Sequence, residues 1–208
     1  MTEVNVNVPL DLHPSRFDRL ASHPDPAIAG RARAAQRAFE QAYARLSAVP
    51  SEEHAIKDNR DWSLEKKQRL IDETRAAAKA EAAATLGKLV EDLDGAVTYF
   101  QGKLDAAAGM KEAPTEVDRE VRAHVRDLPT VEDRVSFLRK LAEKGDRASV
   151  AAVFRGQRFL SGLDDVRDED FAGIRNDVLR LLAPEQHAAL TTIERMRADV
   201  AAAIRLVG

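Results

Sequence analysis

Apolar residues recur at alternating steps of four and three along two stretches of the chain. In the first stretch they are Ile28, Ala32, Ala35, Phe39, Ala42, Leu46 and Val49, and in the second they are Leu86, Val90, Leu93, Val97, Phe100, Leu104 and Ala107. A repeat of this kind places one apolar stripe along the face of a long helix. The pattern therefore predicts two long helices that pack in the manner of a coiled coil.

Local signals set the boundaries of these two helices. Asp25 is suited to cap a helix that begins at Pro26, where the missing N–H of proline removes no hydrogen bond. We expect this helix to end at Pro50, with a polar loop containing a helical turn over residues 51–61. The second helix is predicted to start near residue 61 or 63 and to run uninterrupted towards Pro114. Together they predict a long antiparallel helical hairpin over residues 26–110.

The second helix changes in side-chain size about halfway along. Its stripe is mostly small over residues 64–85 and carries Leu, Val and Phe over residues 86–107. A first helix about 36 Å long would reach only the alanine-rich half when folded back. The far half then needs another cover, either the C-terminal helices or another subunit. We predict that this seam binds a partner through Leu86, Val90, Leu93, Val97, Phe100 and Leu104.

Residues 111–208 read as a compact C-terminal region of shorter helices. The apolar spacing predicts them at residues 115–127, 130–144, 146–163, 171–182 and 184–207. Thr115 and Thr130 each have an aspartate three residues later, which approximates a capping box at a helix start. The acidic residues just before the 171–182 segment are expected to cap that helix and to favour its N-terminus.

Residues 1–25 differ from the rest of the chain. Val4, Val6 and Val8 alternate with polar residues, which favours an extended segment, and several prolines follow. A short helical turn is expected at about residues 15–21. The segment is therefore interpreted as an extended N-terminal arm, which either lies along a partner through its valines or forms a partly ordered tail.

Gly95, Gly102 and Gly109 lie one heptad apart on the face opposite the apolar seam. A glycine inside a helix lowers its stability by about 1 kcal/mol relative to alanine. Two interpretations remain open for this face. It is either a locally soft, bent helix end or a second contact face where another backbone approaches closely.

Composition fits a helical protein with a thin core. The chain has 36 alanines and 56 larger apolar residues, a net charge of −3, and charges of both signs interspersed. It has no cysteine, which excludes disulfides and thiol chemistry and fits a reducing compartment. No signal peptide or apolar run long enough to span a membrane is evident. We expect a cytoplasmic protein without a membrane partner.

The sequence shows no catalytic or metal-binding motif with adequate spacing, so we expect a non-enzymatic protein without a cofactor. The five histidines are scattered, and no phosphate-binding loop or nucleophile motif occurs. One locally basic stretch remains, because the first helix carries several arginines against a single glutamate. Arginines of this kind can bind the phosphates of nucleic acid, although we prefer the interpretation of a solvated helix face. The candidate nucleic-acid residues are Arg31, Arg33, Arg37 and Arg45.

The chain resembles the helical structural and assembly proteins of tailed bacteriophages. The shared features are an N-terminal arm, a long Ala- and Arg-rich helix, short helices and the absence of cysteine. This resemblance implies a structural or scaffold role, partners such as capsid, portal or tail proteins, and a location in the host cytoplasm or the virion. We therefore predict an all-α structural protein that packs against other subunits through protein–protein contacts. The alternatives are a nucleic-acid-associated helical protein and a cytosolic helical regulatory partner.

Overall fold

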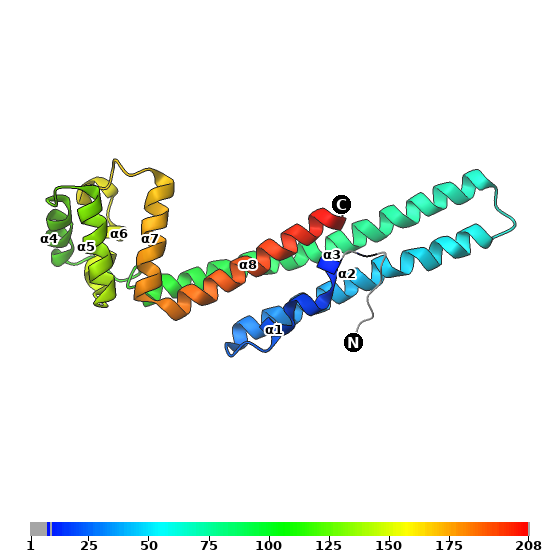
Figure 1. The fold of residues 1–208 in the computed structure, drawn as a ribbon, viewed down its shortest axis with the longest axis horizontal. Coiled ribbons are helices and arrows are strands. Elements are labelled where there is room, and N and C mark those ends of the chain that lie inside the picture. Colours follow the sequence, from blue (N-terminus) through cyan, green and yellow to red (C-terminus); the bar gives the residue numbers. More distant parts are fainter. Residues whose placement is uncertain (1–7, 9, 208) are drawn as a thin grey trace. The chain divides into compact units, whose positions relative to one another are not determined.

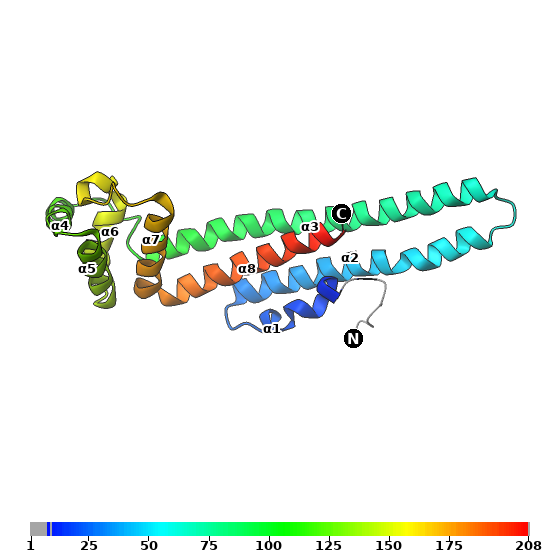
Figure 2. The same cartoon turned by 45° about the horizontal axis from the view of Figure 1, so that its top comes forward.

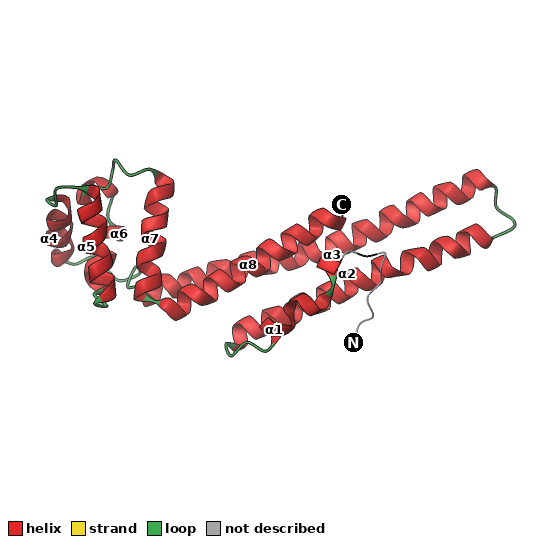
Figure 3. Ribbon diagram, viewed as in Figure 1, coloured by secondary structure: helices red, strands yellow, loops and turns green. Residues whose placement is uncertain are grey.

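The computed structural model describes residues 8 and 10–207, all of which lie in helices, turns or loops (Figures 1 and 3). Within these residues there are eight α-helices and no strand, so the prediction of an all-α fold is confirmed. The chain divides into two compact units, Met1–Ala96 with Thr192–Gly208 (unit 1) and Val97–Thr191 (unit 2). These units differ from the predicted regions 26–110 and 111–208, because the boundary falls inside a helix and the last helix returns to unit 1.

Unit 1 contains the predicted long hairpin. Helix α2 spans Pro26–Asp58, and helix α3, which spans Leu64–Ala107, contributes its residues up to Ala96. The two helices run antiparallel and side by side (Figures 1 and 2). Asp25 accepts a hydrogen bond from the N–H of Ala27 at 2.8 Å, so the predicted cap is confirmed. Apolar residues of the α2 stripe, such as Ala32 and Phe39, are fully buried.

Helix α2 does not end at Pro50 as predicted, because it continues through this proline to Asp58. The added turns are held by ion pairs. Glu53 receives two hydrogen bonds from Arg75 of α3, and Glu52 pairs with Arg45 one turn before the proline. These contacts offset the backbone hydrogen bond that proline cannot donate. The hairpin is therefore longer at its closed end than the sequence indicated.

Within the predicted extended arm, most of residues 10–21 are helical. Two 3-10 helices, Leu10–Leu12 and Pro14–Phe17, precede helix α1, Asp18–Ala21. Phe17 is 1% exposed and packs edge-to-face on Phe39 of α2, with ring centroids 5.0 Å apart. Burial of this ring explains why the chain folds back on α2 rather than extending. The turn expected at about residues 15–21 is confirmed.

Unit 2 is built mainly from short helices. They are α4 (Glu116–Arg126), α5 (Val131–Glu143), α6 (Arg147–Arg155), a 3-10 helix η3 (Arg158–Ser161) and α7 (Asp168–Leu182). The predicted helix over 146–163 breaks at Gly156, where a Cβ atom would lie 2.8 Å from the Cδ of Arg122. A larger residue here would require the Arg122 side chain to move. Helix α7 starts at Asp168, three residues before the predicted start, so three acidic residues fill its first turn, where the helix dipole favours them.

The last helix, α8, spans Pro184–Val207, as predicted. Its residues from Thr192 onward belong to unit 1 and those up to Thr191 to unit 2. In unit 1 its buried positions include Ile193, Met196 and Val200, at a helical spacing of three and four. No helix within the described residues is long and apolar enough to cross a membrane.

Candidate functional site

The predicted partner-binding seam of α3 is largely buried inside the folded chain. Leu86 and Leu93 in unit 1 are at most 1% exposed, and Phe100 and Leu104 in unit 2 are at most 2% exposed. The other two seam residues, Val90 and Val97, are half-buried. The seam is therefore not an open surface of a single copy, which corrects the expectation that it binds a separate partner.

Helix α8 covers the unit 1 part of this seam. Its residues beyond Thr192 lie along α3, as both views show (Figures 1 and 2). Arg197 of α8 forms an ion pair with Asp94 of α3, and Arg16 of the N-terminal turn pairs with Asp199 at 2.6 Å. Of the two covers that the sequence allowed, the C-terminal helix of the same chain is the one observed.

The valines of the predicted arm are only partly described. Val4 and Val6 lie outside the described residues. Val8 is 5% exposed and lines a groove in unit 1 instead of projecting towards a partner. The prediction that Val8 is a free contact residue is therefore corrected.

The four arginines of the predicted nucleic-acid surface do not share one face of α2. At about 100° per residue, Arg33 and Arg37 lie on average about 120° around the helix from Arg31 and Arg45, so the four side chains are spread over nearly half of its circumference. Arg45 is held by Glu81 at 2.5 Å and by Glu52 at 3.1 Å, and hydrogen bonding to Glu81 raises its pKa further. Arg33 donates to the carbonyl of Ala21. Nucleic-acid binding stays a prediction, without a clustered basic surface to support it.

The glycine face of α3 is open in the described structure. A Cβ atom at Gly95 would meet nothing within 4 Å, and one at Gly102 would meet only the end of the flexible Lys111 side chain. Gly109 is outside the helix, with φ +74°, and its left-handed conformation ends α3. Neither helical glycine is therefore required by packing within this chain.

Replacing Gly95 with alanine is expected to raise the free energy of unfolding by about 1 kcal/mol, because alanine lowers the backbone entropy lost on folding into the helix. Urea unfolding followed by circular dichroism would measure this. A loss of stability or of oligomeric mass would instead show that a neighbouring backbone approaches this face.

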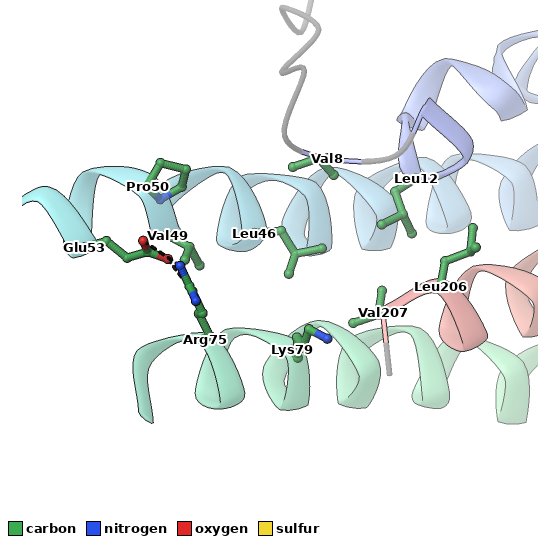
Figure 4. Close-up of a pocket in the computed structure, with 10 residues that line it drawn as sticks. All are labelled: Val8, Leu12, Leu46, Val49, Pro50, Glu53, Arg75, Lys79, Leu206 and Val207. Atoms are coloured by element: carbon green, nitrogen blue, oxygen red, sulfur yellow. Dashed lines mark hydrogen bonds and ion pairs between the residues drawn. The ribbon is translucent and has the colours of Figure 1, made fainter. Parts of the chain in front are cut away.

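An open groove lies in unit 1 between α2, α3 and the last turn of α8 (Figure 4). Its volume is about 510 Å³. The residues that line it are Val8, Leu12, Leu46, Val49, Pro50, Glu53, Arg75, Lys79, Leu206 and Val207. Arg75 donates to both carboxylate oxygens of Glu53, at 2.6 and 2.9 Å. These hydrogen bonds from Arg75 lower the pKa of Glu53, so the pair is charged and mutually neutralised.

A smaller hollow lies on unit 2. Its volume is about 230 Å³, and the residues that line it are Val117, Glu120, Val121, His124, Phe137, Leu141 and Ser149. The ring of His124 packs against that of Phe137, with centroids 5.0 Å apart, and forms one wall. Val117 remains 59% exposed at the hollow, although it belongs to the apolar stripe of α4. An apolar hollow with an exposed apolar rim is suited to receive one side chain of a partner.

A buried ion pair supports this part of unit 2. Asp118 is 3% exposed and accepts hydrogen bonds from the hydroxyl and N–H of Thr115 and from Arg155. Burial alone would raise the pKa of Asp118, but these hydrogen bonds outweigh it and lower that pKa. Arg155 also donates to the carbonyls of Gly109 and Glu112, so one guanidinium ties α4 and α6 to the loop after α3.

Comparison with protein-family models, curated proteins and solved structures found no match. The residues around the two hollows must therefore be interpreted from their chemistry alone. Within the described part of the chain, no group of three or more His, Asp or Glu side chains is arranged to hold a metal ion.

The sequence pattern identified Leu46 and Val49 of the groove as apolar stripe residues but not their exposure. Val117 and Val121, four residues apart on α4, carry the same kind of helical spacing. The pattern shows which residues are apolar on one face, whereas their exposure depends on where neighbouring helices end. No local signal in the sequence marks those end points.

Proposed function

We propose that this chain is a non-enzymatic structural or assembly protein, and that its unit 2 packs against other copies of the chain. The observation that carries the proposal is the apolar hollow beside Val117. At about 230 Å³ it is smaller than most small-molecule pockets, which measure roughly 300–1,000 Å³. Its size and its mostly apolar walls favour a single inserted side chain.

Phe159 of a second copy is the side chain that we assign to this hollow. It lies in η3 of unit 2 and is 55% exposed, although phenylalanine is among the residue types most often buried. A protruding group on one part of a molecule and a hollow on another produce head-to-tail contacts, which build rings or filaments. Repeated assembly of this kind supports the role of a virion or scaffold component, with capsid, portal or tail proteins as further partners.

Replacing Phe159 with serine is expected to raise the dissociation constant of the assembly about tenfold or more. A fully buried Phe contributes about 1.5–3 kcal/mol, and 1.4 kcal/mol corresponds to a factor of ten. Replacing Val117 with glutamate, which places a charge at the rim of the hollow, is expected to have a similar effect. Light scattering after size exclusion, across a concentration series, would measure the oligomeric mass of each variant.

The matched control is Leu206→Ser in unit 1, where the leucine is 50% exposed, and it should leave the mass unchanged. A wild-type chain that remains monomeric over the whole series would contradict self-assembly. One stoichiometric partner of a different sequence, lost in the Val117→Glu variant, would instead favour the alternative of a helical regulatory partner.

A further inference from the structure

We propose that the groove of unit 1 binds a small amphiphile, an aliphatic chain that carries one anionic head group. The volume of the groove, about 510 Å³, lies within the range of small-molecule sites. This site is separate from the hollow of unit 2 and does not rest on the proposed assembly role.

The walls of the groove are suited to an aliphatic chain. Leu46 and Val49 of α2 face Val207 of α8 across it, and Leu12 closes one side (Figure 4). Leu12 is 1% exposed, whereas Leu46 and Val49 are only half-buried, so a bound chain would remove further apolar surface from water.

The charges around the groove favour an anion over a cation. Arg75 and Glu53 neutralise each other through two short hydrogen bonds, and Lys57 adds a third contact to Glu53 at 3.4 Å. Lys79 lies one turn further along α3, on the groove side (Figure 4). Among the described residues, Lys79 forms no hydrogen bond or ion pair. It is therefore the unpaired charge of the lining, and it is positive.

A second role is possible for Lys79, because the carbonyl end of α8 carries partial negative charge and Val207 lies in the same groove. A lysine used only for that purpose would stabilise the fold without selecting a ligand. The two roles differ in a measurable way, since only a binding role makes affinity depend on the charge of the ligand.

The test uses N-phenylnaphthylamine, a neutral fluorophore whose emission rises in apolar sites, with the full chain. Dodecanoate and dodecanol, each below the concentration at which it aggregates, would be compared as competitors. We expect dodecanoate to displace the fluorophore at a lower concentration than dodecanol. Lys79→Met should raise the concentration of dodecanoate that is required at least about threefold, a typical effect for a partly exposed ion pair, and leave dodecanol unchanged.

The matched control is Lys88→Met, because Lys88 is an exposed lysine of α3 outside the groove. It should not change the concentration of dodecanoate or of dodecanol that displaces the fluorophore. Val49→Trp, which fills the groove, should weaken both competitors. Thermal melting of each variant would confirm that it is folded. The proposal would be overturned if the wild-type chain failed to bind the fluorophore or dodecanoate. It would also be overturned if Lys79→Met weakened the binding of dodecanoate and of dodecanol equally.

A second arm identifies the source of the amphiphile. Vesicles of phosphatidylglycerol and of phosphatidylcholine would be sedimented with the chain. Binding to phosphatidylglycerol alone, weakened by Lys79→Met, would support a membrane lipid as the source. Displacement by dodecanoate without vesicle binding would support a free carboxylate. Vesicle binding that Lys79→Met does not change would contradict a role for the groove.

Discussion

Replacing Leu93 with alanine is expected to lower the free energy of unfolding by about 3 kcal/mol and to leave the oligomeric mass unchanged. Leu93 is 1% exposed, inside unit 1. Removing a buried leucine side chain loses its transfer free energy and leaves a cavity, which together cost roughly 2.7–5 kcal/mol. The mass is unaffected because the seam is covered within a single chain. Urea unfolding and light scattering would measure the two quantities.

Leu64→Ala is the matched control, since Leu64 belongs to the same predicted stripe of α3 but is 85% exposed. It should change the free energy of unfolding by less than about 0.5 kcal/mol. If Leu93→Ala instead lowered the mass and left the monomer as stable as before, the seam would face another subunit, as the sequence alone suggested.

Local chemistry made the helix boundaries largely predictable. Thr115 and Thr130 were expected to open helices, and α4 and α5 begin at the residues directly after them. Pro184 begins α8 because its fixed backbone angle suits a first helical position. These signals depend on a few neighbouring residues, which a single sequence displays completely.

The partners of each apolar stripe were not predictable in the same way. The helix that covers Leu93 lies about a hundred residues later in the chain. The spacing of apolar residues does not indicate which of the several apolar helices packs against α3. Pro50 shows the opposite error, because a strong local helix breaker was outweighed by the ion pairs of Glu52 and Glu53. Leu64 has the right spacing but is exposed in its position at the first residue of α3.

The groove of unit 1 and the hollow of unit 2 also result from long-range packing. Each includes apolar residues that neighbouring helices leave partly uncovered, and of these the heptad pattern identified only Leu46 and Val49. Phe159 and Lys79 become candidate binding residues only because neighbouring helices leave these sites partly uncovered. The sequence alone does not distinguish them from any other phenylalanine or lysine. The candidate sites therefore depended on the structure even where their residues had been named in advance.

Replacing Asp118 with alanine is expected to lower the free energy of unfolding by about 3 kcal/mol. The substitution removes one side of a buried ion pair and leaves Arg155, whose side chain is only 12% exposed, without its carboxylate. Breaking such a pair typically costs about 3–5 kcal/mol, and the lower end applies because Arg155 keeps its two backbone carbonyls. Circular dichroism during urea unfolding would measure the loss.

Asp133→Ala is the matched control, because Asp133 occupies the corresponding position of α5 and bonds to Thr130 at the surface. It should lower the free energy of unfolding by no more than about 1 kcal/mol, the usual effect of a lost cap. Equal losses in the two variants would show that capping, and not the ion pair with Arg155, makes Asp118 important.

Acid should reduce the difference in free energy of unfolding between wild type and Asp118→Ala. The pKa of Asp118 is lowered in the folded chain, so its contribution to stability is complete above the pKa of an unfolded aspartate, about 4, and is lost as the pH falls below that value. The unfolding free energies of the two proteins should therefore differ most near neutral pH, and the difference should shrink as the pH falls below about 4 and through the lowered pKa of folded Asp118. A difference that stays constant with pH would mean that Asp118 acts through packing, because only a charged carboxylate that pairs with Arg155 links stability to protonation.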